Sequence, residues 1–321
     1  MSASEVLLET SDGGRVDWRD SLSTQEIAQL RRMRDWRSWF TVVLNWGIVF
    51  AAMAMVAAWP NPLTAVLALF LIGARQLGLA VLMHDASHFA LFSNRRVNDW
   101  VGNWLASYPV WSDMHSYRPY HLRHHARTWT EDDPDLYLAT PFPITPQSFR
   151  RKALRDLTGR TGTKFARFAI RRDFGGEGPW RERIARAIHS PVFRGMLITN
   201  LALLAIVTAA GHPAVYLLWV GAYLTTHTLV TRFRAIAEHS MTPDPTDELK
   251  QTRTTIASWW ERLFLAPNRV NYHLEHHMLM TVPHYNLPRL HRLLKERGVL
   301  EHALIADGYY GVLRQAASKA N

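Results

Sequence analysis

The sequence predicts an all-α integral membrane protein with four transmembrane helices in two hairpins and a cytoplasmic, histidine-rich helical cap. Two observations favour this fold class. Long apolar segments alternate with charged ones, although hydrophobic residues make up only 48% of the 321-residue chain and charged residues 20%. In addition, nine of the sixteen histidines are grouped at helical spacings beside these apolar segments, which indicates a two-metal site in the cap.

The first hairpin is predicted from residues 39–59 and 63–83. The first of these segments has no charged residue over 21 positions. A helix rises about 1.5 Å per residue, so about 20 residues cross a hydrocarbon core of about 30 Å. A proline-rich turn at residues 60–62 leads into the second segment, which only Arg75 and Gln76 interrupt. Such a short connection makes the two helices antiparallel neighbours.

A second hairpin is predicted from residues 192–210 and 213–231, which are joined through Gly211 and His212. Residues 97–111 are also apolar, but the segment is short, rich in tryptophan and carries an aspartate. We therefore expect an interfacial or re-entrant helix there, and no fifth crossing.

Charge predicts the orientation. Residues 150–186 contain twelve Lys or Arg against four Asp or Glu, and the segment before the first span is basic near the membrane. By the positive-inside rule both belong in the cytoplasm. Residues 1–38 are then a cytoplasmic N-terminal segment, and residues 39–321 form one membrane domain. Its cytoplasmic cap comprises residues 84–190 and 232–321, and all nine grouped histidines lie on that side.

Composition and charge limit the partners and cofactors that we expect for this chain. Topology accounts for the net charge of +10, and no nucleic-acid motif appears, so we expect membrane headgroups and no nucleic acid as the partner of the basic stretch. The first thirty residues lack the apolar core of a signal peptide, so the first span is expected to direct insertion. The absence of cysteine excludes disulfides and cysteine-ligated iron–sulfur clusters.

The grouped histidines occur in three boxes and at one single position. The boxes are HDASH, HLRHH and HLEHH, and the single histidine stands in AIAEHS; together they supply His84, His88, His121, His124, His125, His239, His273, His276 and His277. Residues three and four apart share a helix face, so each box can aim its imidazoles at one point. Imidazole binds zinc, copper, iron and nickel, and nine ligands suit two ions. The remaining histidines lack paired spacing and are expected at the surface or behind the ligands.

These boxes resemble those of the membrane fatty acid desaturase superfamily, which also contains hydroxylases and carotenoid ketolases. The resemblance runs over residues 75–292 and includes HDASHFALFSNRRVNDWVGNW, YRPYHLRHH and NYHLEHH. The compact first box and Ala235, where acyl-CoA desaturases have an asparagine, depart from the acyl-CoA branch. His273, where front-end desaturases have glutamine, and the lack of a fused haem signature depart from that branch too. The type that the chain still resembles is the general bacterial acyl-lipid desaturase, which implies a location in a bacterial inner membrane.

The resemblance implies an oxygen-dependent enzyme with two iron ions (Fe²⁺/Fe³⁺) that introduces a double bond into a fatty acyl chain of a membrane lipid or acyl carrier. Two zinc ions also fit nine histidines, but zinc does not activate oxygen to break an unactivated C–H bond. A lipid hydroxylase or a carotenoid ketolase or hydroxylase on the same scaffold remains the alternative. A metal transporter is disfavoured, because its histidines are expected within the spans.

Other polar residues are interpreted around this site. Asp85, Glu238 and Glu275 adjoin box histidines, and we expect them to fix the orientation of ligating rings. Asp132, Asp133 and Asp135 have the same role or cap the start of a loop. Arg75 and Gln76 lie at membrane depth, and we expect them to contact the polar head of the substrate or a box carboxylate. The alternative for Arg75 is a purely structural role. Electrons are expected from an external donor such as ferredoxin with its reductase, because the chain has no haem signature and no dinucleotide fingerprint.

Overall fold

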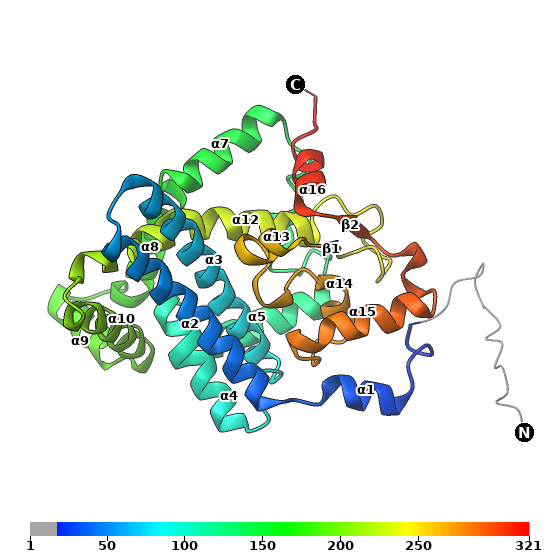
Figure 1. The fold of residues 1–321 in the computed structure, drawn as a ribbon, viewed down its shortest axis with the longest axis horizontal. Coiled ribbons are helices and arrows are strands. Elements are labelled where there is room, and N and C mark those ends of the chain that lie inside the picture. The colour runs from blue at the N-terminus through cyan, green and yellow to red at the C-terminus, as the bar shows by residue number, and fades with distance from the viewer. Residues whose placement is uncertain (1–17, 321) are drawn as a thin grey trace, which may run out of the picture.

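The computed structural model describes residues 18–320 and is built almost entirely of helices (Figure 1). The α-helices are α1 (Thr24–Arg31), α2 (Asp35–Ala58), α3 (Pro62–Ser87), α4 (Arg95–Val101), α5 (Met114–Arg127), α6 (Leu136–Ala139), α7 (Pro146–Leu157), α8 (Arg160–Phe174), α9 (Trp180–His189), α10 (Pro191–Ala209), α11 (Tyr216–Leu224), α12 (Thr226–His239), α13 (Trp259–Phe264), α14 (His273–Met278), α15 (Leu287–Glu296) and α16 (Tyr309–Ala316). Two short strands, β1 (Thr254–Ile256) and β2 (Ile305–Asp307), pair in parallel.

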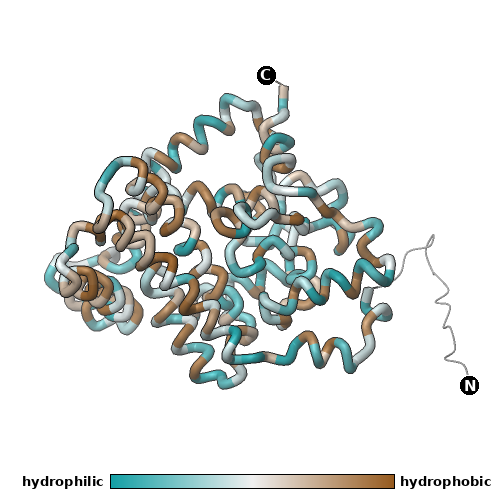
Figure 2. Tube along the Cα trace, viewed as in Figure 1, coloured by the Kyte–Doolittle hydropathy of each residue, from teal (hydrophilic) through white to brown (hydrophobic). Residues whose placement is uncertain are grey.

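Within the described residues, three helices are long and apolar enough to cross a membrane. They are α2, α3 and α10, with 24, 26 and 19 residues. Figure 2 shows that hydrophobic residues dominate these helices, whereas the C-terminal part of the chain alternates between hydrophobic and hydrophilic residues. Each helix contains one of the predicted spans to within a few residues, and the protein is a membrane protein with a mostly helical fold.

The fourth predicted span, residues 213–231, is not one continuous helix. A 3-10 turn (Pro213–Val215) and α11 are followed by a break at Thr225, whose φ and ψ are −120° and −85°. Three threonine hydroxyls donate to main-chain carbonyls around the break, including Thr226 Oγ1 to Leu69 O at 2.5 Å and Thr228 Oγ1 to Thr225 O at 2.7 Å. Such bonds compete with the helical ladder and bend helices. Beyond the break, α12 continues to His239, as the metal hypothesis requires.

The predicted helix over residues 97–111 is observed as three helical types in succession. The helix α4 continues into a π-helical turn (Gly102–Ser107) and a 3-10 turn (Tyr108–Val110). A π turn frees main-chain groups, and Trp46 Nε1 donates to Leu105 O at 3.0 Å. Gly102 packs directly against Ala86 of α3, with no space for a side chain. The segment thus lies against the end of α3 that carries the first histidine box.

The basic stretch forms three helices, α7, α8 and α9, for which no helix is predicted from the sequence. Two of them, α7 and α8, pack beside the break in the fourth predicted span: Gly162 of α8 contacts the backbone of Leu224, and Asp156 of α7 pairs with Arg232 of α12 at 2.5 Å. The basic stretch therefore contacts the chain both before and after the break.

The described part of the N-terminal segment packs against the C-terminal part of the chain. Residues 1–17 of the predicted segment 1–38 lie outside the described residues, and α2 begins four residues before the predicted span. Leu22 and Leu30 are buried with Leu290 and Leu294 of α15, and Glu26 pairs with Arg297 at 2.5 Å. The helix α1 therefore lies beside α15 (Figure 1).

Candidate metal centre

All nine predicted histidines converge in one region of the fold. They come from four helix segments: the end of α3, α5, the end of α12 and α14. The capping of α3 at His88 and of α5 by Asp113 fixes where these helices end and begin. Because box residues lie three or four positions apart on each helix, their rings share a face and meet in the centre.

Five of the histidines form a first group. The candidate ligand atoms of His84, His88, His121, His125 and His276 all lie within 4.8 Å of one another. In this group the Nε2 atoms of His121 and His125 are 3.0 Å apart, and those of His125 and His276 are also 3.0 Å apart.

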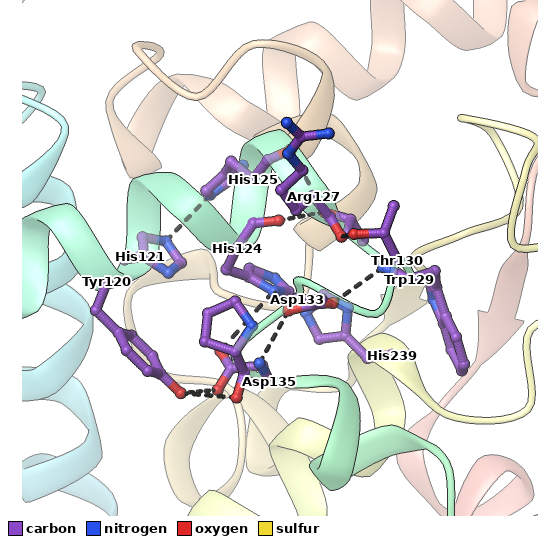
Figure 3. Close-up of polar contacts among 12 residues, drawn as sticks. Tyr120, His121, His124, His125, Arg127, Trp129, Thr130, Asp133, Asp135 and His239 are labelled. Atoms are coloured by element: carbon purple, nitrogen blue, oxygen red, sulfur yellow. Dashed lines mark hydrogen bonds and ion pairs between the residues drawn. The ribbon is translucent and has the colours of Figure 1, made fainter.

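The other four histidines form a second group. The candidate ligand atoms of His124, His239 and His277 lie within 4.8 Å of one another. His273 joins them, with its Nε2 2.7 Å from that of His239 and 3.1 Å from that of His277. Figure 3 shows His239 of α12 next to His124 of α5, with 4.8 Å between the ring centroids.

The electrostatics of both groups suit metal binding. Burial lowers the pKa of His88 to about 3, and it lowers the pKa of His273, His276 and His277 to well below the usual value. The rings are thus neutral and retain lone pairs. With metal–imidazole bonds of about 2.1 Å, two ligand nitrogens at right angles lie about 3.0 Å apart, which is the spacing between the Nε2 atoms here.

Several buried ring nitrogens lack any other use. Among residues 18–320, no hydrogen-bond partner exists for His84 Nε2, for either ring nitrogen of His88 or for His121 Nδ1. Leaving a buried polar atom unpaired costs about 1–3 kcal/mol. A cation bound by His84 Nε2 and by one ring nitrogen of His88 removes that cost for those two atoms. Together with the two groups of closely spaced ring nitrogens, this means that the residues present fit two metal ions.

Asp85 and Asp133 lie directly behind ligand candidates. Asp85 Oδ1 is 3.2 Å from His84 Nδ1, while Asp85 Oδ2 accepts from His284 Nδ1 at 2.8 Å. Asp133 Oδ1 accepts from His124 Nδ1 at 2.8 Å (Figure 3), and the same side chain accepts from the backbone N–H of Trp129 at 2.9 Å. Asp133 thus both holds a ring and caps a loop. Such contacts leave Nε2 of His84 and His124 free for a metal.

The neighbouring aspartates do not contact the histidines in the same way. Asp132 is exposed and pairs with Arg123 at 3.0 Å. Asp135 accepts from the Tyr120 hydroxyl at 2.5 Å and lies 3.9 Å from His124 Nδ1.

The two glutamates differ in what they contact. Glu275 Oε1 accepts from His291 Nδ1 at 2.5 Å and Oε2 from the Thr254 hydroxyl, so both oxygens are taken by residues outside the nine histidines. Glu238 Oε1 accepts from Arg234 Nε at 2.5 Å, and its Oε2 lies 3.6 Å from His273 Nε2.

Arg75 and Gln76 are both buried, but they face different neighbours. Arg75 donates to Leu263 O at 2.5 Å and lines a cavity of about 660 Å³ between α2 and residues 259–288. His284 and Thr41 form part of the same wall, and their side chains are 3.1 Å apart. Gln76 Nε2 donates to Trp219 O at 2.9 Å and so connects α3 to α11.

Sequence reasoning left several contacts of the site unassigned. His284 and His291 are among the histidines expected at the surface or behind the ligands, and each donates to a carboxylate that follows or precedes a box histidine. Tyr117 stacks on His121 with ring centroids 4.9 Å apart, and Arg118 joins α5 to the end of α3 by donating to Ser87 O at 2.9 Å. The only signal for the two histidines was their position in VPHYNLPRLH, a few residues after the third box.

Comparison with known proteins shows the family to which the chain belongs. Residues 60–307 match the model of the family described as fatty acid desaturase. The chain is 30% identical to dihydrorhizobitoxine desaturase of Bradyrhizobium elkanii, over 75% of this chain and 70% of the relative. It is also 25% and 26% identical to sn-1 oleoyl-lipid 12-desaturases of a Picosynechococcus species and Arthrospira platensis, over 81% and 78% of this chain and 77% and 74% of the relatives. The chain belongs to the fatty acid desaturase family and is an oxidoreductase that acts on a fatty acyl chain.

Proposed function

We propose that this protein is an oxygen-dependent di-iron desaturase that introduces a double bond into an acyl chain of a membrane lipid or acyl carrier. The observation that supports it most is the pair of histidine groups, most of whose rings are buried, and which include His84 and His88 at the end of the apolar helix α3. Iron is preferred to zinc because removal of hydrogen from an unactivated chain needs a redox metal. The lipid-linked substrates in the names of two relatives favour a lipid-linked chain.

In this proposal the two histidine groups each hold one iron ion. The first group is His84, His88, His121, His125 and His276, and the second is His124, His239, His273 and His277. Irons held there would activate O₂, which is the oxidant of the reaction. Two hydrogens leave the chain, and two electrons and two protons from outside complete the reduction of O₂ to two waters. Asp85 and Asp133 hold the rings of His84 and His124, and Glu238 and Glu275 lie next to box histidines. Because these carboxylates and most of the histidines are buried, bulk water is kept away from the site.

We propose that the substrate approaches through the cavity lined by Arg75. Apolar side chains of α2, such as Phe40 and Leu44, line one wall, and Arg37 and Arg262 contribute positive charge. An acyl chain suits the apolar wall, and a polar head suits the arginines. Gln76 contacts the backbone of α11, which favours a structural role for it in positioning the helices.

The proposed topology keeps the active site in the cytoplasm of a bacterium, at the inner membrane. Residues 213–231, although broken at Thr225, make the fourth crossing together with α2, α3 and α10. Residues 84–190 and 232–321 then form the cap, and residues 1–38 lie on the same side. A soluble donor such as ferredoxin with its reductase delivers the two electrons there.

The test is lipid mass spectrometry of a host with and without expression of this chain. We expect acyl chains that have lost two hydrogens, together with two irons per chain in the purified protein. A gain of oxygen identifies a hydroxylase or ketolase and overturns desaturation. Two zincs per chain, with activity that iron does not restore, overturn the di-iron assignment.

A further inference from the structure

The two histidine groups are unequal. The first offers five ring nitrogens, and the second offers four, from His124, His239, His273 and His277. Histidines and carboxylates together are common ligands of non-haem iron. A carboxylate that faces the second group is therefore a candidate for its fifth ligand.

Glu238 is that carboxylate. It is the last residue of α12 before His239, and only 2% of its surface is exposed. Its Oε2 lies 3.6 Å from His273 Nε2, and the ligand atoms of Glu238, His239 and His273 all fall within 4.8 Å of one another. The carboxylate thus reaches the space that the second group surrounds.

The two oxygens of Glu238 have different environments. Arg234 Nε donates to Oε1 at 2.5 Å, and this contact holds the side chain in place. Oε2 is buried and has no hydrogen-bond partner among residues 18–320. A buried, unpaired carboxylate oxygen is costly unless a cation or donor satisfies it. The ion pair with Arg234 accounts for Oε1 but leaves Oε2 unexplained.

We propose that Glu238 Oε2 is a direct ligand of the metal ion held by the second histidine group, with Arg234 as the positioning residue. Each metal then has five protein ligands. This inference rests on the proposed di-iron function. It separates Glu238 from Glu275, whose oxygens are both occupied by Thr254 and His291.

The test compares Glu238→Gln with the wild-type protein, both purified with ⁵⁷Fe. Mössbauer spectra report the environment of each iron, and a chelator competition reports how fast each iron is lost. The matched control is Asp156→Asn, which removes another buried carboxylate paired to an arginine of α12, but one away from the histidines. Because Gln leaves Arg234 unpaired in the interior, the double variant Glu238→Gln/Arg234→Gln is measured beside it.

We expect the signal of one iron to change in Glu238→Gln and in the double variant, and that iron to be lost at least about tenfold faster, while Asp156→Asn keeps the wild-type spectrum and release rate. Wild-type spectra and release rates in both Glu238 variants overturn the ligand assignment alone. Failure of the wild-type protein to bind two irons overturns the di-iron proposal itself, so the two failures are distinguishable.

Discussion

Asp85 shows how single residues complete the metal centre. Its carboxylate lies between His84, which belongs to a box, and His284, which comes 199 positions later in the chain and from no box. His284 donates both its ring Nδ1 and its backbone N–H to the same oxygen, at 2.8 and 3.2 Å. The carboxylate is thereby held where it can orient the His84 ring.

Replacing His284 should therefore weaken the metal site although His284 is no proposed ligand. In His284→Ala, Asp85 loses a ring donor and is free to turn away from His84. We expect iron affinity to fall by about 10- to 100-fold, the usual effect of losing a residue that orients a ligand. Chelator competition on purified protein measures this, with the exposed His302→Ala as the control. Unchanged iron retention in His284→Ala contradicts the orienting role.

Replacing a proposed ligand should have a larger effect. We expect His84→Ala, His124→Ala, His239→Ala and His276→Ala each to lose bound iron and turnover, because a coordination position opens at a centre that needs both metals. Membrane insertion should persist, since the spans fold on their own apolar packing. Iron analysis, product analysis and membrane fractionation check the three effects, and an active His239→Ala removes that residue from the site.

At the scale of elements, the crossing of α3 and α12 positions His239. Gly73 of α3 faces the break between α11 and α12: a Cβ there would lie 2.8 Å from the His227 backbone nitrogen and closer still to Thr226 Oγ1. Thr226 Oγ1 also donates to Leu69 O of α3. Close backbone approach thus holds the start of the helix that carries His239 and Glu238.

Adding one methyl group at Gly73 should disturb this crossing. We expect Gly73→Ala to destabilise the fold by about 1–3 kcal/mol, as overpacking does, and to lower iron content by shifting α12. Gly47→Ala on α2 is the matched control, because no atom lies within 4 Å of the added Cβ. Thermal midpoints by fluorescence-detected gel filtration and iron analysis test this. Equal midpoints for both variants contradict the close crossing.

At the scale of the whole molecule, basic residues exceed acidic ones and are concentrated in one stretch. The chain carries 37 Lys and Arg against 27 Asp and Glu, and twelve of the basic residues lie in residues 150–186, the stretch that forms α7, α8 and α9. Such a basic stretch attracts an acidic electron carrier as well as anionic lipid. The proposed donor should therefore dock by complementary charge.

Turnover with an acidic ferredoxin and its reductase should fall as salt rises, because exposed charges are screened over about 8 Å at physiological ionic strength. Initial rates over a salt series measure this. Rates with a small chemical reductant in place of ferredoxin provide the control and should change much less. Turnover with only oxygen and NADPH contradicts an external donor.

Much of the fold followed from local patterns. The helices α2, α3 and α10 were predictable because an apolar run of about 20 residues meets the length of the bilayer without help from distant residues. The box histidines were predictable because a spacing of three or four positions already places them on one helix face. Neither inference needed knowledge of which helix packs against which.

What the tertiary structure decided depends on residues far apart in the chain. The break at Thr225 has no proline beside it and forms where threonine hydroxyls and the close approach of Gly73 offer other contacts. His284 at Asp85, His291 at Glu275 and the division of nine histidines into groups of five and four are likewise set by packing. One sequence determines which side chains share a helix face, because that is local geometry. It does not reveal which faces meet, because those contacts depend on the whole fold.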